Sequence, residues 1–199
     1  MKTLFSALLL FPMLAVAQPM AMQSTGSGFF VNVHGNYSQW NFSGDEFGGT
    51  GGAGVGLRLG YGFTEGVAIF LEADAAALSE EDDVSGATLD YTLGQGVLGV
   101  QYTFGSTVSK VRPYAEAGLL AIQTTVDIAG SDATFTGAGA NFGGGVKYHF
   151  NLGLALDAGV RIGVGSLSEA EFLGETIEIE DGGLTSYRFN VGITWHPGQ

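Results

Sequence analysis

The feature that most constrains the fold of this chain is the way its charges separate along the sequence. Fifteen of the 20 acidic residues, and none of the seven Lys and Arg residues, fall in four segments, about 40–52, 78–90, 123–136 and 166–184. Between these segments apolar residues alternate with small or polar ones, a period-two pattern that indicates β-strands rather than helices. The 34 Gly residues fit this pattern, because Gly destabilises helices but marks bends and close approaches in strands.

Eight strands in four hairpins are predicted, at about 28–39, 53–63, 67–76, 88–104, 111–123, 138–150, 154–164 and 186–195. The connections at 64–66, 105–110 and 151–153 are short, and the other four are long and acidic. This arrangement is typical of a bacterial outer-membrane barrel. We therefore predict an all-β fold, an eight-stranded antiparallel up-and-down transmembrane β-barrel with short periplasmic turns and long acidic extracellular loops.

The strand at 88–104 is less regular than the others. Leu89, Tyr91 and Leu93 share one parity, whereas Leu98, Val100, Tyr102 and Phe104 share the other. A β-bulge inserts one residue into a strand and would bring both sets to the same face. The sequence therefore predicts a bulge near 94–96.

The face opposite the apolar one carries charges of both signs among many glycines. If the turn at 64–66 places Phe63 opposite Val67, Arg58 faces Glu72 across the hairpin and Gly56 faces Asp74. A similar count places Lys147 opposite Asp157. Paired charges suit the interior of a narrow barrel, where an unpaired charge is costly. The predicted interior charge network consists of Arg58, Glu72, Asp74, Glu116, Lys147, Asp157, Arg161 and Arg188.

An eight-stranded barrel is just wide enough for its own side chains to fill it. The charged pairs, together with Phe30, Phe70 and Tyr114, should therefore block a wide pore. A soluble ligand-binding barrel, which would place the apolar face inside, is the alternative architecture.

Aromatic residues gather toward both ends of the predicted strands, as in the two girdles of membrane barrels. The predicted membrane-interface aromatics are Phe29, Tyr37, Trp40, Tyr61, Phe63, Tyr102, Phe104, Tyr148, Phe150, Tyr187 and Trp195.

The N-terminal segment 1–17 has the pattern of a secretory signal peptide. Lys2 precedes an apolar stretch that ends in Ala15, Val16 and Ala17, a small-residue cleavage site. A membrane anchor is the alternative, although the apolar run is shorter than the ~20 residues that a spanning helix needs. We expect 18–27 to be a short lead-in and 28–199 to be the barrel domain, in the outer membrane of a Gram-negative bacterium.

The composition excludes several kinds of site. There is no Cys, so disulfides and thiolate metal sites are absent, and no cofactor is predicted. An excess of acidic residues disfavours nucleic acid, whose phosphates are bound by Lys and Arg. Loop carboxylates could hold Ca²⁺ or Mg²⁺, although they lack the spacing of a ligand loop, so solvated charge is the simpler interpretation. The candidate cation-binding residues are Glu80, Glu81, Asp82, Asp83, Glu178, Glu180 and Asp181.

At three places the chain resembles the small eight-stranded barrels of the OmpA/OmpX group. These are GFFVNV at 28–33, RPYAEAGL at 112–119 and the closing strand at 187–195. The resemblance implies a barrel inserted by the barrel-assembly machinery, in contact with lipid and lipopolysaccharide. Two features differ from the group. Members usually end on an aromatic residue, whereas here Trp195 is followed by four more residues, and no peptidoglycan-binding domain follows.

The function predicted is a structural or surface-interaction role, in adhesion or envelope integrity, for a monomer whose loops could contact a host or cell-surface ligand. One alternative is a lipid A-modifying enzyme that uses His34 or His149, with Ser38, Asp74 or Asp157 nearby. Acyl chemistry of this kind needs a nucleophile beside the His, and neither His has an obvious one. A narrow ion-conducting channel is the other alternative.

Overall fold

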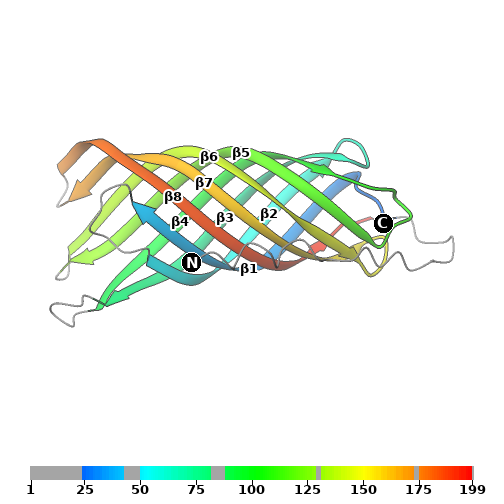
Figure 1. Ribbon diagram of the computed structural model, residues 1–199, viewed down its shortest axis with the longest axis horizontal. Helices are drawn as coiled ribbons and strands as arrows, with labels where there is room; N and C mark the ends of the chain where they lie inside the picture. The colour runs from blue at the N-terminus through cyan, green and yellow to red at the C-terminus, as the bar shows by residue number, and fades with distance from the viewer. Residues whose placement is uncertain (1–23, 43–49, 82–87, 129–130, 173–174, 199) are drawn as a thin grey trace, which may run out of the picture.

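The computed structural model describes residues 24–42, 50–81, 88–128, 131–172 and 175–198, which form a single closed β-barrel (Figure 1). Each strand pairs antiparallel with the next, and β1 pairs with β8 to close the barrel. Within these residues no helix is long and apolar enough to cross a membrane. The predicted fold class is confirmed. The strands are β1 Gly28–Phe42, β2 Thr50–Gly62, β3 Val67–Glu81, β4 Thr88–Thr103, β5 Val111–Ile128, β6 Ser131–His149, β7 Leu154–Phe172 and β8 Glu175–Trp195.

The short turns lie together at one end of the barrel, with the C-terminus (Figure 1). In the β2–β3 turn the Thr64 hydroxyl accepts hydrogen bonds from the backbone N–H groups of Gly66 and Val67, at 3.3 and 3.0 Å. In the β6–β7 turn the Asn151 side chain accepts one from the Gly153 N–H at 2.9 Å. Such side-chain bonds stabilise tight turns and thereby set the register of the hairpins.

The predicted register is confirmed. Arg58 is the partner of Glu72 on the β2–β3 ladder, Gly56 is the partner of Asp74, and Lys147 is the partner of Asp157 on the β6–β7 ladder. Because side chains alternate between the two faces of a strand, this register places the charges of each pair on the same face of the sheet.

The apolar face points outward and the charged face points inward. Leu57, Val160 and Ile193 are 45%, 59% and 42% exposed, whereas Arg58 and Glu72 are 2% and 1% exposed. A soluble barrel would show the opposite distribution, because its apolar side chains would fill the centre. The exterior is therefore an apolar band suited to hydrocarbon.

The predicted bulge in β4 is wrong. The ladders of β4 with β3 and β5 run without a register shift. Leu93 and Val97 point into the lumen, while Leu98, Val100 and Tyr102 point outward. The change in apolar parity arises because inward-facing residues of β4 are themselves apolar. The register shifts lie elsewhere, at Thr136/Gly137 on the β6–β7 ladder and at Leu167/Glu169 on the β7–β8 ladder.

All four acidic segments are partly strand and differ in this from the loops that we expected, two of them over most of their length. Ladder pairs continue through 123–136, as in Thr124 with Phe135, and through 166–184, as in Glu171 with Thr176. β8 is 21 residues long, about twice the 9–11 residues that cross a bilayer. These two hairpins therefore extend well beyond an apolar band of membrane thickness. The connections at 43–49 and 82–87 lie outside the described residues.

Candidate functional site

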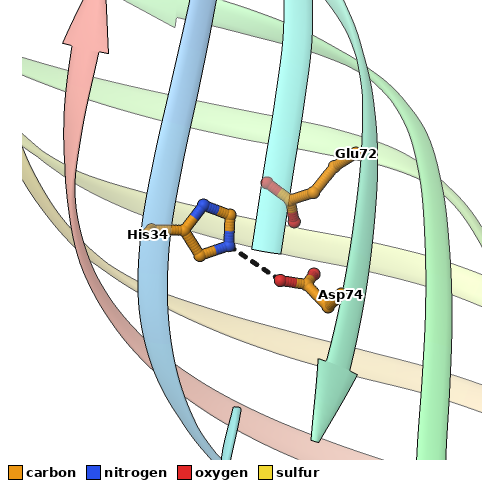
Figure 2. Close-up of side chains that lie close together, drawn as sticks. All are labelled: His34, Glu72 and Asp74. Atoms are coloured by element: carbon orange, nitrogen blue, oxygen red, sulfur yellow. Dashed lines mark hydrogen bonds and ion pairs between the residues drawn. The ribbon is translucent and has the colours of Figure 1, made fainter. Parts of the chain in front are cut away.

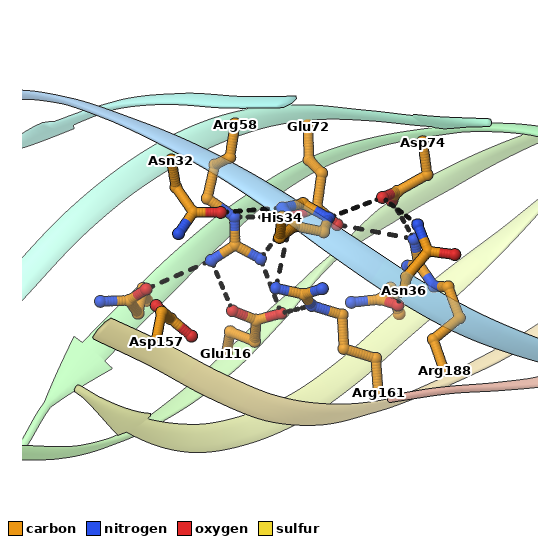
Figure 3. Close-up of polar contacts among 12 residues, drawn as sticks. Asn32, His34, Asn36, Arg58, Glu72, Asp74, Glu116, Asp157, Arg161 and Arg188 are labelled. Atoms are coloured by element: carbon orange, nitrogen blue, oxygen red, sulfur yellow. Dashed lines mark hydrogen bonds and ion pairs between the residues drawn. The ribbon is translucent and has the colours of Figure 1, made fainter. Parts of the chain in front are cut away.

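Six charged side chains meet in the centre of the lumen (Figure 3). Arg58, Arg161 and Arg188 come from β2, β7 and β8, while Glu72, Asp74 and Glu116 come from β3 and β5. All six are buried. Strand alternation turns them inward, and the closed barrel brings together strands that are far apart in the sequence.

Arg58 contacts both glutamates of this network. Its Nε donates to Glu72 Oε2 at 2.6 Å, and its Nη1 and Nη2 donate to the two carboxylate oxygens of Glu116 at 2.8 and 3.0 Å. The contact with Glu116 is the bidentate geometry that makes Arg–carboxylate pairs strong. The Arg58 guanidinium also lies 3.9 Å from the centre of the Phe70 ring.

Arg161 and Arg188 complete the network. Arg161 Nε donates to Glu116 Oε1 at 2.5 Å and its Nη2 lies 3.3 Å from Glu72. Arg188 pairs with Asp74, lies 3.5 Å from Glu72 and donates to Asn141 at 3.0 Å. Three guanidinium groups thus balance three carboxylates, so the centre of the lumen carries no large net charge.

His34 joins this network beside Glu72 and Asp74 (Figure 2). Its Nε2 lies 2.7 Å from Asp74 Oδ1 and its Nδ1 lies 2.8 Å from Asn32 Oδ1. One ligand atom from each of His34, Glu72 and Asp74 lies within 4.8 Å of the others, which is close enough to hold a metal ion.

The surrounding arginines make this trio a poor metal site. Glu72 and Asp74 are already engaged in ion pairs with Arg58, Arg161 and Arg188. A divalent cation would bring two further positive charges into a low-dielectric interior in which the existing charges balance. The chemistry of the trio therefore favours a hydrogen-bonded structural network.

The remaining predicted members, Lys147 and Asp157, lie closer to the short-turn end. Asp157 accepts a hydrogen bond from the Tyr114 hydroxyl at 2.8 Å. The Lys147 ammonium lies over two rings, 5.0 Å from the centre of Phe30 and 5.4 Å from that of Tyr114. Lys147 is therefore held by cation–π contacts beside its register partner and is separate from the arginine network.

The histidines considered for catalysis have different surroundings. Both ring nitrogens of His34 have hydrogen-bond partners, and the nearby Ser38 hydroxyl donates to Asn36 at 3.2 Å. Ser38 is therefore not hydrogen-bonded to His34 as a nucleophile would be to its base. His149 is also buried, at the short-turn end, and neither of its ring nitrogens has a partner among the described residues.

An apolar cluster occupies the loop side of the lumen, which the sequence analysis did not predict. On several strands the inward-facing residue a few positions beyond the charge network, toward the loops, is large and apolar. The residues on this side are Trp40, Ala76, Leu93, Leu120, Ile122, Leu167 and Leu184. They belong to a larger buried apolar cluster that also includes Val97, the register partner of Glu72, and Phe30, Ala68 and Phe70 nearer the short turns. The signal was present in the sequence as apolar residues on the inward parity.

Trp40 corrects the predicted aromatic girdle. It is 2% exposed, because it shares the inward parity of His34 and Ser38, so it cannot contact lipid. The other predicted interface aromatics all point outward and are 40% exposed or more: Phe29, Tyr37, Tyr61, Phe63, Tyr102, Phe104, Tyr148, Phe150, Tyr187 and Trp195. Three pairs of them stack edge to face beside the short turns, with centroids 4.8 to 5.5 Å apart: Tyr61 with Phe63, Tyr102 with Phe104, and Tyr148 with Phe150.

The side chains of the candidate cation-binding residues lie outside the part of the chain that the structure describes. These are Glu80, Glu81, Asp82, Asp83, Glu178, Glu180 and Asp181.

The sequence analysis also missed partners of the network that carry no charge. Gln101 accepts a hydrogen bond from Arg58 at 3.2 Å, Asn141 accepts one from Arg188, and Asn36 donates to Asp74 at 3.1 Å. Their inward parity was visible in the sequence. Which charged residue each of them would contact depends on how the barrel closes, so it could not be predicted from the sequence.

Solved structures of small outer-membrane barrels share this fold. Neisserial surface protein A matches with a TM-score of 0.66 and 21% identity, over 85% of this chain and 97% of that one. The outer membrane protein OprG of Pseudomonas aeruginosa matches with a TM-score of 0.61 and 15% identity, over 87% and 98%. The attachment invasion locus protein Ail of Yersinia pestis, in complex with the heparin analogue sucrose octasulfate, matches with a TM-score of 0.52 and 13% identity, over 85% and 99%.

No curated protein matches the chain. A family model does, and it covers residues 6–196, which include every strand of the barrel. The outward apolar face, the closed antiparallel sheet and this match agree on the location of the protein in the outer membrane. The chain belongs to the outer membrane protein beta-barrel domain family.

Proposed function

We propose that this protein is a closed-lumen outer-membrane barrel that acts at the cell surface, in adhesion or envelope integrity, through its projecting hairpins. The observation that carries the proposal is the filling of the lumen. The six-charge network occupies the centre, and the apolar cluster around Trp40 and Leu120 lies on its loop side. A lumen filled by its own side chains leaves no wide path for solutes.

The projecting hairpins supply the surface for interaction. β5 with β6, and β7 with β8, continue as paired ribbons beyond the length that crosses a bilayer. Each strand of the barrel pairs with two others of the same chain, so a monomer closes the barrel wall without a partner.

The charge of the hairpins indicates the kind of partner. The four acidic segments contain no Lys or Arg, so they repel polyanions. The heparin analogue in the Ail structure is a polyanion. The acidic segments of this protein would repel such a partner, because charge complementarity favours binding between surfaces of opposite sign. We expect a basic surface, or a lipopolysaccharide or host surface bridged by divalent cations.

Two measurements test the proposal together. In planar lipid bilayers the purified protein should give none of the large conductance steps of an open pore. Whole cells that display the protein should bind a basic or Ca²⁺-bridged surface, and replacing 125–134 and 169–178 by tight turns should abolish that binding.

Val108→Ser, in the turn at the other end, is the matched control and should bind as the parent does. Large conductance steps, or equal binding by the parent and the shortened protein, would contradict the proposal. Conversion of labelled lipid A that is lost in His34→Ala or His149→Ala would favour the enzymatic alternative instead.

A further inference from the structure

The short-turn end of the lumen is closed by segments that precede and follow the barrel strands. The lead-in at 24–27 lies across this end, where Ser24 Oγ donates to the Thr107 carbonyl at 2.9 Å. The Glu65 carboxylate of the β2–β3 turn accepts hydrogen bonds from the Gly26 N–H at 2.6 Å and the Ser27 hydroxyl at 3.2 Å. Just after β8, the His196 N–H donates to the Gly153 carbonyl at 2.8 Å. Beneath these contacts lies a small cavity, here called the mouth pocket, of about 10 Å³.

Four basic side chains line the mouth pocket: Arg112, Lys147, His149 and His196. All four are at least 95% buried. Arg112 Nε, both ring nitrogens of His149 and Nδ1 of His196 have no hydrogen-bond partner among the described residues. Buried polar groups are nearly always hydrogen-bonded, so several unpaired groups around one cavity point to a ligand that accepts hydrogen bonds.

The carboxylates near the pocket are engaged elsewhere. Glu65 is the acidic residue of its lining, and its half-exposed carboxylate is held by the lead-in, 4.0 Å from Arg112 Nη1. Asp157, the register partner of Lys147, accepts the Tyr114 hydroxyl. Within the described part of the chain Lys147 has no carboxylate oxygen within 4.0 Å, the limit for an ion pair. Arg112, Lys147 and two imidazoles thus face one lining carboxylate, which favours an anion.

We propose that the mouth pocket binds one small inorganic anion of the size of chloride, held by Arg112 and Lys147 and by the ring N–H groups of His149 and His196. The volume determines the size class. A cavity of about 10 Å³ holds roughly one water-sized particle, so a halide fits, whereas a phosphate would displace the lead-in.

The state of His196 agrees with this site. Burial and then the neighbouring positive charge of Lys147 lower the pKa of His196 to about 4. At neutral pH the ring is therefore uncharged, with one nitrogen that donates a hydrogen bond. A bound anion stabilises the protonated ring, so occupancy of the pocket should raise the pKa of His196.

The test is a chloride titration of the full chain in detergent micelles, followed by the ring NMR signals of His149 and His196. The control titration uses gluconate, an anion too large for the pocket, at equal ionic strength. We expect a saturable shift with chloride and none with gluconate, and a higher pKa of His196 in chloride. Lys147→Gln and Arg112→Gln should each weaken chloride binding at least tenfold.

Lys110→Gln is the matched control, because Lys110 lies at the same end of the barrel but does not line the pocket. It should bind chloride as the parent does. Heat-shifted gel mobility identifies the variants that are folded, and having two pocket variants keeps the test decisive if one of them fails to fold. Equal shifts in chloride and gluconate, unchanged affinity in a folded pocket variant, or tighter binding of inorganic phosphate than of chloride would each overturn the proposal.

Discussion

Arg58 and Glu72 are register partners on β2 and β3, and their side chains meet inside the barrel with Nε and Oε2 2.6 Å apart. The same guanidinium binds Glu116 of β5 on another part of the barrel wall. Arg58 therefore links the β2–β3 hairpin to a charge network that crosses the lumen. The strength of that network is open to direct measurement.

Glu116→Gln should destabilise the barrel strongly. Glu116 accepts hydrogen bonds from both Arg58 and Arg161, and its neutralisation leaves an excess positive charge in a buried site. Breaking a buried pair in this way costs about 3–5 kcal/mol. The measurement is the free energy of unfolding in urea with the protein in lipid vesicles. Glu169→Gln, at an exposed position on β7, is the control and should change it by less than about 0.5 kcal/mol.

A charge on the outer face should be costly in proportion to its depth in the membrane. Val160 lies about midway along the first ~10 residues of β7, the length that crosses a bilayer, and is 59% exposed on the apolar exterior. Val160→Arg should therefore lower the unfolding free energy in vesicles by about 2–4 kcal/mol, against about 0–1 kcal/mol for a site near the interface. Phe150→Arg, beside the β6–β7 turn, represents the interface. Equal costs at the two positions would contradict the membrane placement of this face.

Two glycines on opposite faces should respond differently to a methyl group. A Cβ on Gly99 would lie 2.5 Å from the Phe70 ring and 2.8 Å from the Ala117 carbonyl oxygen, so the backbone must shift. A Cβ on Gly35 would meet only the Gly54 carbonyl oxygen, at 3.9 Å. Gly99→Ala should cost about 1–3 kcal/mol of stability through overpacking, while Gly35→Ala should be neutral or stabilising by up to about 1 kcal/mol. Urea unfolding of the two variants under one set of conditions decides the point.

Acid should weaken the short-turn end through His196. In the folded protein the pKa of His196 is lowered from 6.5 to about 4, so the unfolded chain takes up a proton first as the pH falls. The contribution of this residue to stability is therefore intact above about pH 6.5 and is lost as the pH falls toward 4. The loss should be on the order of 3 kcal/mol at most.

Comparison with His196→Gln isolates this contribution, because the carboxylates titrate in both proteins. The stability of the parent relative to the variant should decline between pH 6.5 and 4. If the difference in unfolding free energy between the parent and the variant stays constant over that range, His196 has the same pKa in the folded and the unfolded protein, which would contradict the prediction.

The register and the inward charges could be predicted from the sequence because both are local. A short turn beside Phe63 fixes which residues of β2 and β3 are partners, and strand alternation then fixes their faces. The contact of Arg58 with Glu116 could not be predicted in this way. Its two residues lie on β2 and β5, which are not neighbours in the sheet, and their separation depends on how the barrel closes.

The errors have a common physical origin in the apolar part of the lumen. Trp40 was assigned to the membrane interface, and the predicted bulge would have placed Leu93 on the outer face with Leu98. Both assignments rested on the expectation that large apolar side chains contact lipid. Trp40 and Leu93 both obey strand parity and point inward. Strand parity was a better guide to the facing of these residues than their apolar character. In a strand without a bulge each residue keeps the face that alternation gives it, and the uncharged part of the barrel interior can hold apolar side chains.

The pairing of Arg188 with Asp74 has a consequence for the integrity of the closed sheet. The two residues are 114 positions apart, and Arg188 lies on the last strand. A barrel opened between β1 and β8, with β8 displaced, would leave Glu72 and Asp74 without one of their cations and would carry surplus negative charge in its wall. The seam between β1 and β8 is therefore held by electrostatics as well as by its ladder, because opening it exposes a buried carboxylate without a partner.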